Sequence, residues 1–529
     1  MSATTSAAAA GRFDCIVIGA GHNGLVCATY LARAGRRVLV AEASDQVGGA
    51  AVTREFAPGH RVSAGAHLLH QMPRALVEDL GLAAHGLSYA AREMPTTALA
   101  AGGAPLPIGT RGLATLGALS AHDATAYPAF SARLARFARV LYPLLDSIPP
   151  RLGTDAWHDR LAFLKLGWRV RTLGRRDMRE LLRIIGMNAY DLISDEFETP
   201  LLKGALGFDA ILGTNFGPRA PGTVLTLLNR LAAESAVGGL PLSQPKGGMG
   251  ALSEALAKAA VAAGATIRTG ARIASVRVLE DRVAGVALES GESIDAAVVL
   301  SSADAKTTLL KLLGTRHLDT GFVRRVDHLR NTGLAAKLHL ALDRAPVFPG
   351  TDAAALGGRL LIAPSLDYIE RAWNHSKYGE SSASPAIEIT VPTINDSSLA
   401  PAGRHVLSAI VQYVPYGSKA GQNAERARCL ENVLATLEAH APGLRASVTA
   451  SEFLIPADLE REFGMSGGHW HHGELAFDQF YMVRPVPGAA QYRTPVAGLY
   501  LCGASCHPGG GVMGLAGRNA ARALLRGAA

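Results

Sequence analysis

The residues best suited to chemistry in this sequence are three glycines and an acid at fixed spacing. The glycine pattern, G-x-G-x-x-G, is formed by Gly19, Gly21, His22, Asn23 and Gly24. In such a pattern the first glycine permits a tight turn, the second lets the backbone approach a pyrophosphate, and the third lets a helix pack on a strand. Glu42, eighteen residues after the last glycine, is placed to accept hydrogen bonds from ribose hydroxyls. These residues predict a site that binds a dinucleotide.

The chain around the glycines predicts the elements that must position them. Residues 15–18 are a short apolar run typical of a buried parallel strand, and a helix is expected over about 24–34. The pyrophosphate would lie at the helix N-terminus, where free N–H groups and the helix dipole favour negative charge. A second strand is predicted over residues 37–41, directly before Glu42. The glycine pattern therefore lies in a strand–helix–strand unit.

A second glycine turn indicates which dinucleotide is bound. Gly48, Gly49 and Ala50 begin six residues after Glu42. In FAD-binding oxidoreductases such a turn brings the chain back against the ribityl diphosphate of the flavin. The carboxylate of Glu42 also disfavours a 2′-phosphate on the ribose. The sequence therefore favours FAD over NAD.

A third glycine-rich segment lies near the end of the sequence. A strand is predicted over residues 498–502 and a helix over 514–526, with a turn between them. Backbone N–H groups before this helix can bind the pyrimidine end or ribityl chain of the flavin. Ile273, at the start of another predicted strand, is expected near the adenine. The residues of the turn expected to contact FAD are Gly503, Gly510, Gly511, Val512 and Met513.

Three histidines are candidates for removing a proton from a substrate. His67, His472 and His507 lie in segments expected to converge on the flavin, and His507, beside the glycine turn, ranks first. Each of them could equally be a structural histidine satisfied by backbone groups. His469 and His471 lie close to His472, but their spacing matches no known zinc pattern, so no metal site is predicted.

The composition excludes several classes of protein. The chain has 529 residues, 48% of them hydrophobic and 18% charged, as expected of a globular protein with a large core. The net charge is +8, but the basic residues neither form long runs nor alternate with aromatic residues, so nucleic acid is not an expected partner. No apolar run approaches the length that spans a bilayer. Residues 1–11 are expected to be a disordered tail, and the odd number of cysteines fits a reducing, cytoplasmic location.

The order of these patterns predicts an α/β fold with two domains. The FAD-binding domain, Rossmann-like and bipartite, is expected to comprise residues 12–72, 241–315 and 488–529. The second, α+β domain would bind the substrate and comprise residues 73–240, mainly helical, and 316–487. Alternating apolar and polar residues predict an antiparallel sheet in it, with strands near 335–342, 386–391 and 405–413.

One stretch of the second domain is unusually basic. Residues 157–183 carry eight arginines or lysines against three acids, among aromatic and aliphatic residues. Such a stretch can lie on an anionic membrane surface or pack against a partner subunit of the same chain. A solvated helix face with ordinary salt bridges is an equally good interpretation.

Long stretches of the sequence resemble a known family. They are VIGAGHNGLV at 17–26, VGGAAVT at 47–53, GPRAPGT at 217–223, YIERAW at 368–373, HGELAFDQ at 472–479 and HPGGGVMGLAGRNAA at 507–521. The chain resembles FAD oxidoreductases of the phytoene desaturase and carotenoid isomerase type, most closely the branch of pyridine nucleotide-disulphide oxidoreductase domain-containing protein 2. The resemblance implies the bipartite FAD fold of amine oxidases, with a domain that caps the flavin and holds a substrate tunnel. Ala50 stands where desaturases of this family often carry an arginine.

The expected activity is the FAD-dependent removal of hydride from a carbon of an apolar or cyclic small molecule, which gives a C=C bond. Oxygen or a quinone would accept the electrons. A redox-neutral isomerase that needs reduced FAD, amine oxidation, and a flavin-stabilised, membrane-associated binding protein are the alternatives. Disulfide reduction is disfavoured because no C-x-x-x-x-C follows the first glycine motif and no second G-x-G-x-x-G is present.

Overall fold

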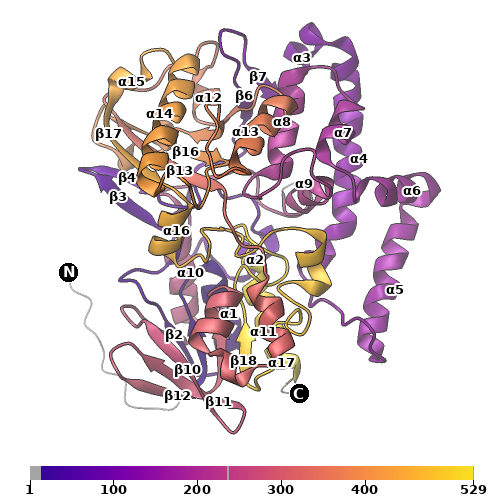
Figure 1. Cartoon of the computed structure of the whole chain (residues 1–529), viewed down its shortest axis with the longest axis vertical. Helices are drawn as coiled ribbons and strands as arrows, with labels where there is room; N and C mark the ends of the chain where they lie inside the picture. Colours follow the sequence, from indigo (N-terminus) through magenta and orange to yellow (C-terminus); the bar gives the residue numbers. More distant parts are fainter. Residues whose placement is uncertain (1–12, 235–236, 528–529) are drawn as a thin grey trace.

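The computed structural model describes residues 13–234 and 237–527, so the predicted tail at 1–11 lies outside the described residues. Two seven-stranded sheets form the two halves of the molecule, and a group of helices lies beside them (Figure 1). The predicted α/β class is confirmed.

The first sheet has the strand order β10-β11-β12-β1-β2-β9, and β18 pairs with β12. The central strands β12, β1 and β2 are parallel, and apolar side chains such as Ile16 and Val17 are fully buried between the layers. The strands are β1 (Phe13–Ile18), β2 (Val38–Ala41), β9 (Thr266–Arg268), β10 (Ile273–Leu279), β11 (Arg282–Leu288), β12 (Ser293–Ser301) and β18 (Leu499–Leu501). All of them come from the three segments predicted for the FAD-binding domain.

Three helices pack together against this sheet: α1 (His22–Arg33), α10 (Met249–Ala262) and α17 (Leu515–Gly527). Their close approach depends on glycine. A Cβ on Gly24 would stand 2.1 Å from the carbonyl oxygen of Gly19, and one on Gly517 would stand 1.9 Å from that of Asn23. No larger residue fits at either position without moving the backbone. The third glycine of the pattern therefore has the packing role predicted for it.

The second sheet has the strand order β17-β13-β16-β15-β14-β6-β7. Its strands are β6 (Thr96–Ala98), β7 (Leu106–Ile108), β13 (Ala335–Leu342), β14 (Arg359–Ile362), β15 (Ala386–Thr390), β16 (His405–Gln412) and β17 (Val448–Leu454). One face packs on α14 (Gln422–His440) through alternate residues such as Leu338 and Leu340. Lys337 and His339 alternate with these leucines along β13 and therefore point to the other face.

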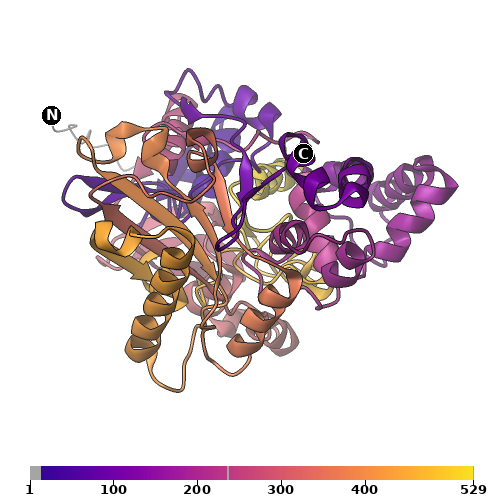
Figure 2. The ribbon, with the colours of Figure 1, turned by 90° about the horizontal axis from the view of Figure 1, so that it is seen from above.

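The helices beside this sheet form a further apolar core. They include α3 (Leu113–Leu119), α4 (Ala121–Leu145), α7 (Ala189–Ser194), α8 (Pro200–Ile211), α9 (Thr223–Ala232) and α13 (Leu366–Ser376). Helix α2 (Arg74–Asp79) instead packs with the core of the first sheet through Leu76. Two more, α5 (Trp157–Thr172) and α6 (Gly174–Ile184), extend away from the body (Figure 2). The expected helical character of 73–240 is largely right, but it missed β6 and β7, because strands of three residues are too short to show alternation.

Smaller elements complete the fold. The hairpin β3 (Thr53–Ala57) and β4 (His60–Ser63) contacts both α10 and the second sheet. Apart from short 3-10 and π turns, the remaining helices and strands of the described residues are β5 (Tyr89–Ala91), β8 (Gln244–Pro245), α11 (Thr320–Asp327), α12 (Ala353–Leu356), α15 (Leu444–Ser447) and α16 (Pro456–Phe463). The first sheet thus carries the glycine turns, and the second sheet turns its polar face toward them.

Candidate active site

A cavity of about 540 Å³ lies between the two halves of the molecule. The glycine turns of the first half line one end, and polar side chains of the second sheet line the other. The predicted cofactor residues that line it are Gly19, Gly21, His22, Asn23, Glu42, Gly48, Gly49, Ala50, Ile273, Gly510, Gly511 and Val512. Four separate stretches of the chain therefore meet at this end of the cavity.

Three residues predicted to contact FAD lie behind the cavity wall instead. Gly24 is in the helix–strand contact described above. A Cβ on Gly503 would stand 2.2 Å from the carbonyl oxygen of Ser302, so this glycine serves backbone packing. Met513 is 2% exposed and belongs to the core between the helices. These residues shape the cradle without lining it.

The glycine end has the shape and the donors that a dinucleotide needs. Gly21 is the N-cap of α1, and nothing lies within 4 Å of the position that a Cβ would take there, so the helix start faces open space. Glu42 ends β2, where Oε2 accepts a hydrogen bond from Ala20 N at 2.6 Å and Oε1 accepts one from Ser44 N at 2.9 Å. These bonds hold the carboxylate beside the first glycine turn. The residues present therefore fit FAD.

The other end of the cavity is lined by ionisable side chains from the second sheet. Lys337 on β13 and Glu388 on β15 are both in register with Ile410 on β16, so they flank it on the same face. Glu388 Oε1 lies 2.8 Å from Nε2 of His67 and Oε2 accepts a hydrogen bond from Nε of Arg359 at 2.5 Å. The side chains of Glu388, His67 and Arg359 are each 3 or 4% exposed. This is a buried charged row, and only His67 was predicted from the sequence.

The electrostatics of this row fix its charge states. Burial alone would raise the pKa of Glu388, but Arg359 and the His67 contact hold that pKa well below its usual range. Burial, with the nearby Lys337 charge, lowers the pKa of His67 to about 4. At neutral pH Glu388 is therefore a carboxylate and His67 a neutral ring. Arg359 also donates to Asp209 Oδ1 at 2.6 Å, which extends the row to α8.

Lys337 differs from its neighbours because its amine makes no hydrogen bond to another described residue. The residue is 2% exposed, it lines the cavity, and within the described part of the chain its Nζ has no hydrogen-bond partner. Burial lowers its pKa to about 7, with Glu388 opposing the shift. A substantial fraction of Lys337 is therefore a neutral amine near pH 7, and it can accept a proton. The signal in the sequence is a lysine inside an otherwise apolar strand, AAKLHLAL.

His472 lines the cavity, whereas His507 does not. His472 is held at a positive φ of 53°, and burial lowers its pKa. His507 is fully buried; its Nε2 lies 2.7 Å from the carbonyl oxygen of Leu144, and its own carbonyl accepts a hydrogen bond from the Tyr492 hydroxyl. The structure therefore places the first-ranked histidine in the packing between the flavin turn and α4, away from substrate.

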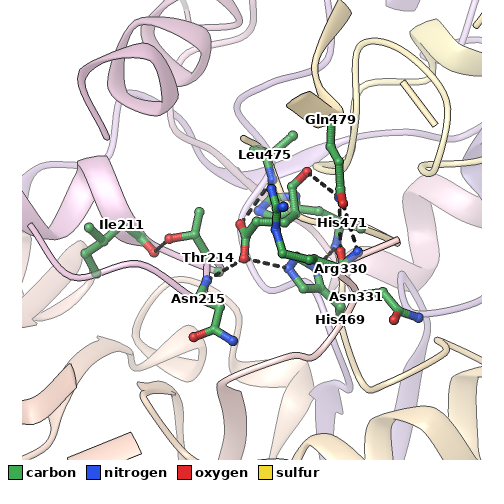
Figure 3. A network of polar contacts seen from close by, with 12 residues as sticks. Ile211, Thr214, Asn215, Arg330, Asn331, His469, His471, Leu475 and Gln479 are labelled. Atoms are coloured by element: carbon green, nitrogen blue, oxygen red, sulfur yellow. Dashed lines mark hydrogen bonds and ion pairs between the residues drawn. The ribbon is translucent and has the colours of Figure 1, made fainter. Parts of the chain in front are cut away.

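The loop that carries His472 is fixed by a polar network (Figure 3). Glu474 Oε2 accepts a hydrogen bond from Asn215 N at 2.8 Å and lies 3.5 Å from Nε2 of His469, and Gln479 binds the backbone of Arg330. The loop at 213–222, rich in glycine and proline, contributes Thr214 to the cavity lining.

Arg484 joins this loop to the flavin-side turn. It is 1% exposed, and its guanidinium donates to backbone carbonyl oxygens on both sides. The acceptors are His471, Gly473, Glu474, Gln479, Ala504 and Cys506. Burial lowers its pKa to about 10, so the group still carries its charge at neutral pH. This role could not be predicted from sequence, because backbone carbonyls are present at every residue.

The described residues contain one group of three side chains with metal-ligand geometry: His122, Asp123 and Glu198. It does not line the cavity. Asp123 already accepts hydrogen bonds from the backbone N–H groups of Glu198 and Thr199. The group therefore has a structural role at the start of α8.

Comparison with known proteins agrees with this architecture. The family described as flavin containing amine oxidoreductase matches residues 24–525, and the chain belongs to it. The chain is 37% identical to pyridine nucleotide-disulfide oxidoreductase domain-containing protein 2 of Rattus norvegicus, over 97% of this chain and 94% of the rat protein. It is 26% identical to phytoene desaturase (lycopene-forming) of Pantoea ananas, over 96% and 98% of the two chains.

A solved structure shares the fold. The crystal structure of an oxidoreductase from Methanosarcina mazei superposes with a TM-score of 0.60 at 19% identity, covering 97% of this chain and 99% of that one. The predicted resemblance to the amine oxidase and phytoene desaturase type is thus confirmed, as is the FAD cofactor. The protein is an oxidoreductase of this flavin family.

Proposed function

We propose that the protein is an FAD-dependent dehydrogenase that removes the elements of dihydrogen from a carbon–carbon bond of an apolar or cyclic small molecule. FAD, when bound, accepts the hydride from one carbon. The neighbouring carbon gives up a proton, its C–H electron pair becomes the π bond, and a C=C bond results. The observation that carries this proposal is a cavity lined both by the glycine turns of the flavin cradle and by Lys337, whose amine has no hydrogen-bond partner among the described residues.

Lys337 is the group best placed to take the proton. Its burial keeps part of it neutral at pH 7, and its Nζ has no competing partner among the described residues. His67 is held by Glu388 and is already neutral, with a pKa near 4 that makes it a weak base. We therefore assign His67 and Glu388 to positioning the cavity wall around Lys337.

Apolar side chains surround the space between the two ends and suit a hydrocarbon skeleton. The lining includes Leu212, Ile410, Trp470 and Leu475. The name of the Pantoea ananas relative, a phytoene desaturase, supports a reaction that forms C=C bonds. The family description admits an amine substrate, but the ionisable row offers no free carboxylate to an ammonium group, because Glu388 and Asp209 are both paired with Arg359.

Anaerobic flavin reduction tests this function. The purified holoenzyme is mixed with terpenoids, cyclic ketones and acyl compounds, and bleaching of the flavin absorbance is followed, with product masses measured afterwards. We expect at least one apolar compound to bleach the flavin and to return a product that has lost two hydrogen atoms. A product of unchanged mass would indicate an isomerase, and bleaching by amines alone would indicate an amine oxidase; either result overturns the proposal.

A further inference from the structure

Helix α5 exposes large apolar side chains along one of its faces. Together with α6 it projects from the side of the molecule, away from both sheets (Figures 1 and 2). Its sequence, WHDRLAFLKLGWRVRT, is rich in aromatic and aliphatic residues, yet the only buried residue in it is Asp159. A helix with this composition is normally covered by a core, a partner or a membrane.

The exposed apolar residues of α5 form one stripe. They are Trp157, Leu164 and Trp168, and the half-buried Leu161 lies between the first two; the spacings of four, three and four residues place all four on the same face of a helix. Trp157 is 69% exposed, Leu164 63% and Trp168 70%, values far above those of core residues. The opposite side of the helix, which carries Val170, packs toward the helical core.

Cationic side chains border this stripe on both sides. At 100° per residue, Arg160 and Arg171 lie along one edge and Lys165 along the other, and all three are exposed; Arg160 forms an ion pair with the exposed Asp155 before the helix. The acid on α5, Asp159, lies on the far side and is 4% exposed. The surface therefore combines an apolar stripe with positive edges.

Helix α6 also exposes an apolar residue together with cationic side chains. Leu181 and Ile184 are buried on its inner face. Its outer face carries Leu182, which is 64% exposed, and the exposed arginines Arg175, Arg176, Arg179 and Arg183. Arg183 pairs with Glu180, so α6 keeps three arginines without a carboxylate partner among the ion pairs of the described residues.

We propose that α5 and α6 form a docking surface for an anionic lipid bilayer. Tryptophan side chains favour the membrane–water interface, and arginine and lysine bury their stems while the charged ends reach the lipid phosphates. A second copy of this surface fits poorly, because the basic edges would face basic edges and repel. Across the part of the chain that the structure describes, no helix is long and apolar enough to cross a membrane, so the contact is peripheral.

Vesicle binding by the intact holoenzyme tests this surface independently of the reaction catalysed. Vesicles of phosphatidylcholine alone are compared with vesicles in which about one third of the lipid is phosphatidylglycerol, at low and high salt. We expect co-sedimentation with the anionic vesicles and its loss at high salt. Equal binding to both vesicle types, or binding to neither, would overturn the proposal.

Two variants locate the binding site. Trp168→Ala combined with Leu164→Ala, and separately Arg160→Glu combined with Lys165→Glu, should each lower the affinity for anionic vesicles by more than about tenfold. Leu279→Ala, which alters a leucine that is 69% exposed on the β10–β11 hairpin, is the matched control and should leave binding unchanged. Bound flavin and turnover should be normal in all three, because α5 does not line the cavity.

Light scattering decides between a membrane and a second copy of the chain. The proposal expects the same molar mass for the wild-type protein and the Trp168→Ala, Leu164→Ala variant in the absence of lipid. A wild-type dimer that this variant converts to a monomer would show that the stripe joins two copies, and would overturn the membrane assignment.

Discussion

The two sheets have the same number of strands, but they line the cavity with different parts of the chain. In the first sheet the central strands are apolar on both faces, and the binding residues lie in the turns that follow the strands. In the second sheet each strand is apolar on the α14 side, and ionisable side chains lie on the cavity side. The first half binds mainly with its backbone, and the second half presents side chains.

This difference separates the roles of the two halves. Backbone N–H groups at a helix start recognise a pyrophosphate whatever reaction the flavin performs. The charges on the second sheet set the proton chemistry and depend on their neighbours. Damage to the first half should therefore remove the cofactor, whereas damage to the second should alter stability or rate while the flavin stays bound.

The largest expected effect is on stability, in the second sheet. Arg359→Met leaves the carboxylate of Glu388 buried without its cation, which should cost about 3–5 kcal/mol of unfolding free energy. The control in the first sheet is Arg277→Met, which breaks the exposed pair with Asp295 and should cost about 0–1 kcal/mol. Denaturant unfolding followed by circular dichroism measures both. Equal losses of unfolding free energy in the two variants would contradict the proposed difference between the sheets.

The second largest effect is on FAD affinity and comes from the first half of the molecule. Gly21→Leu fills the open space at the start of α1 and should weaken FAD binding by about 100-fold or more, about 2.7 kcal/mol. Gly167→Ala is the control, because it too has no atom within 4 Å of the new Cβ but lies on α5. Titration of the apoprotein with FAD gives the affinities. A Gly21→Leu protein that keeps its flavin would contradict the placement of the pyrophosphate.

The third effect is on rate alone. Lys337→Met removes the proton acceptor and should slow flavin reduction by about 100-fold with FAD still bound. Lys377→Met changes a lysine that hydrogen-bonds to Asn374 on the surface and should react normally. Rapid-mixing spectroscopy under anaerobic conditions measures the reduction. A normal rate in Lys337→Met would exclude this lysine as the base.

The smallest effect is a pH dependence. The pKa of Lys337 is lowered to about 7, and the active form is the neutral amine. The rate should therefore rise with pH through about 7 and fall up to about tenfold for each unit below it. His67, with a pKa near 4, contributes nothing in this range. The profile should become flat in Lys337→Met; an unchanged profile would assign the titration to another group.

The sequence predicted the fold, and most of the residues it proposed for FAD binding line the cavity. Glycine patterns are local, so Gly19 to Gly24 and the Gly48-Gly49 turn could be interpreted from neighbouring residues, and the predicted strand at 335–342 coincides with β13. The ionisable row of the second sheet was largely missed. Lys337, Arg359 and Glu388 are far apart in sequence, and only the pairing of their strands brings them to one face of the sheet.

His507 shows the limit of reasoning from position in the sequence. It lies beside the flavin-side turn, as predicted, but its ring points into the packing with α4. The direction of a side chain depends on contacts between segments far apart in the chain. The role of Arg484 could not be predicted for the same reason, because its hydrogen-bond acceptors are backbone carbonyls of two separate loops.

The closure of the first sheet by β18 has a consequence for biosynthesis. β18 pairs with β12, and α17 packs on α1, so the ribosome must release the last elements before the earliest ones gain all their neighbours. Pairings that span so much of the chain form slowly. A nascent chain therefore presents an incomplete cradle until β18 and α17 have emerged and joined β12 and α1.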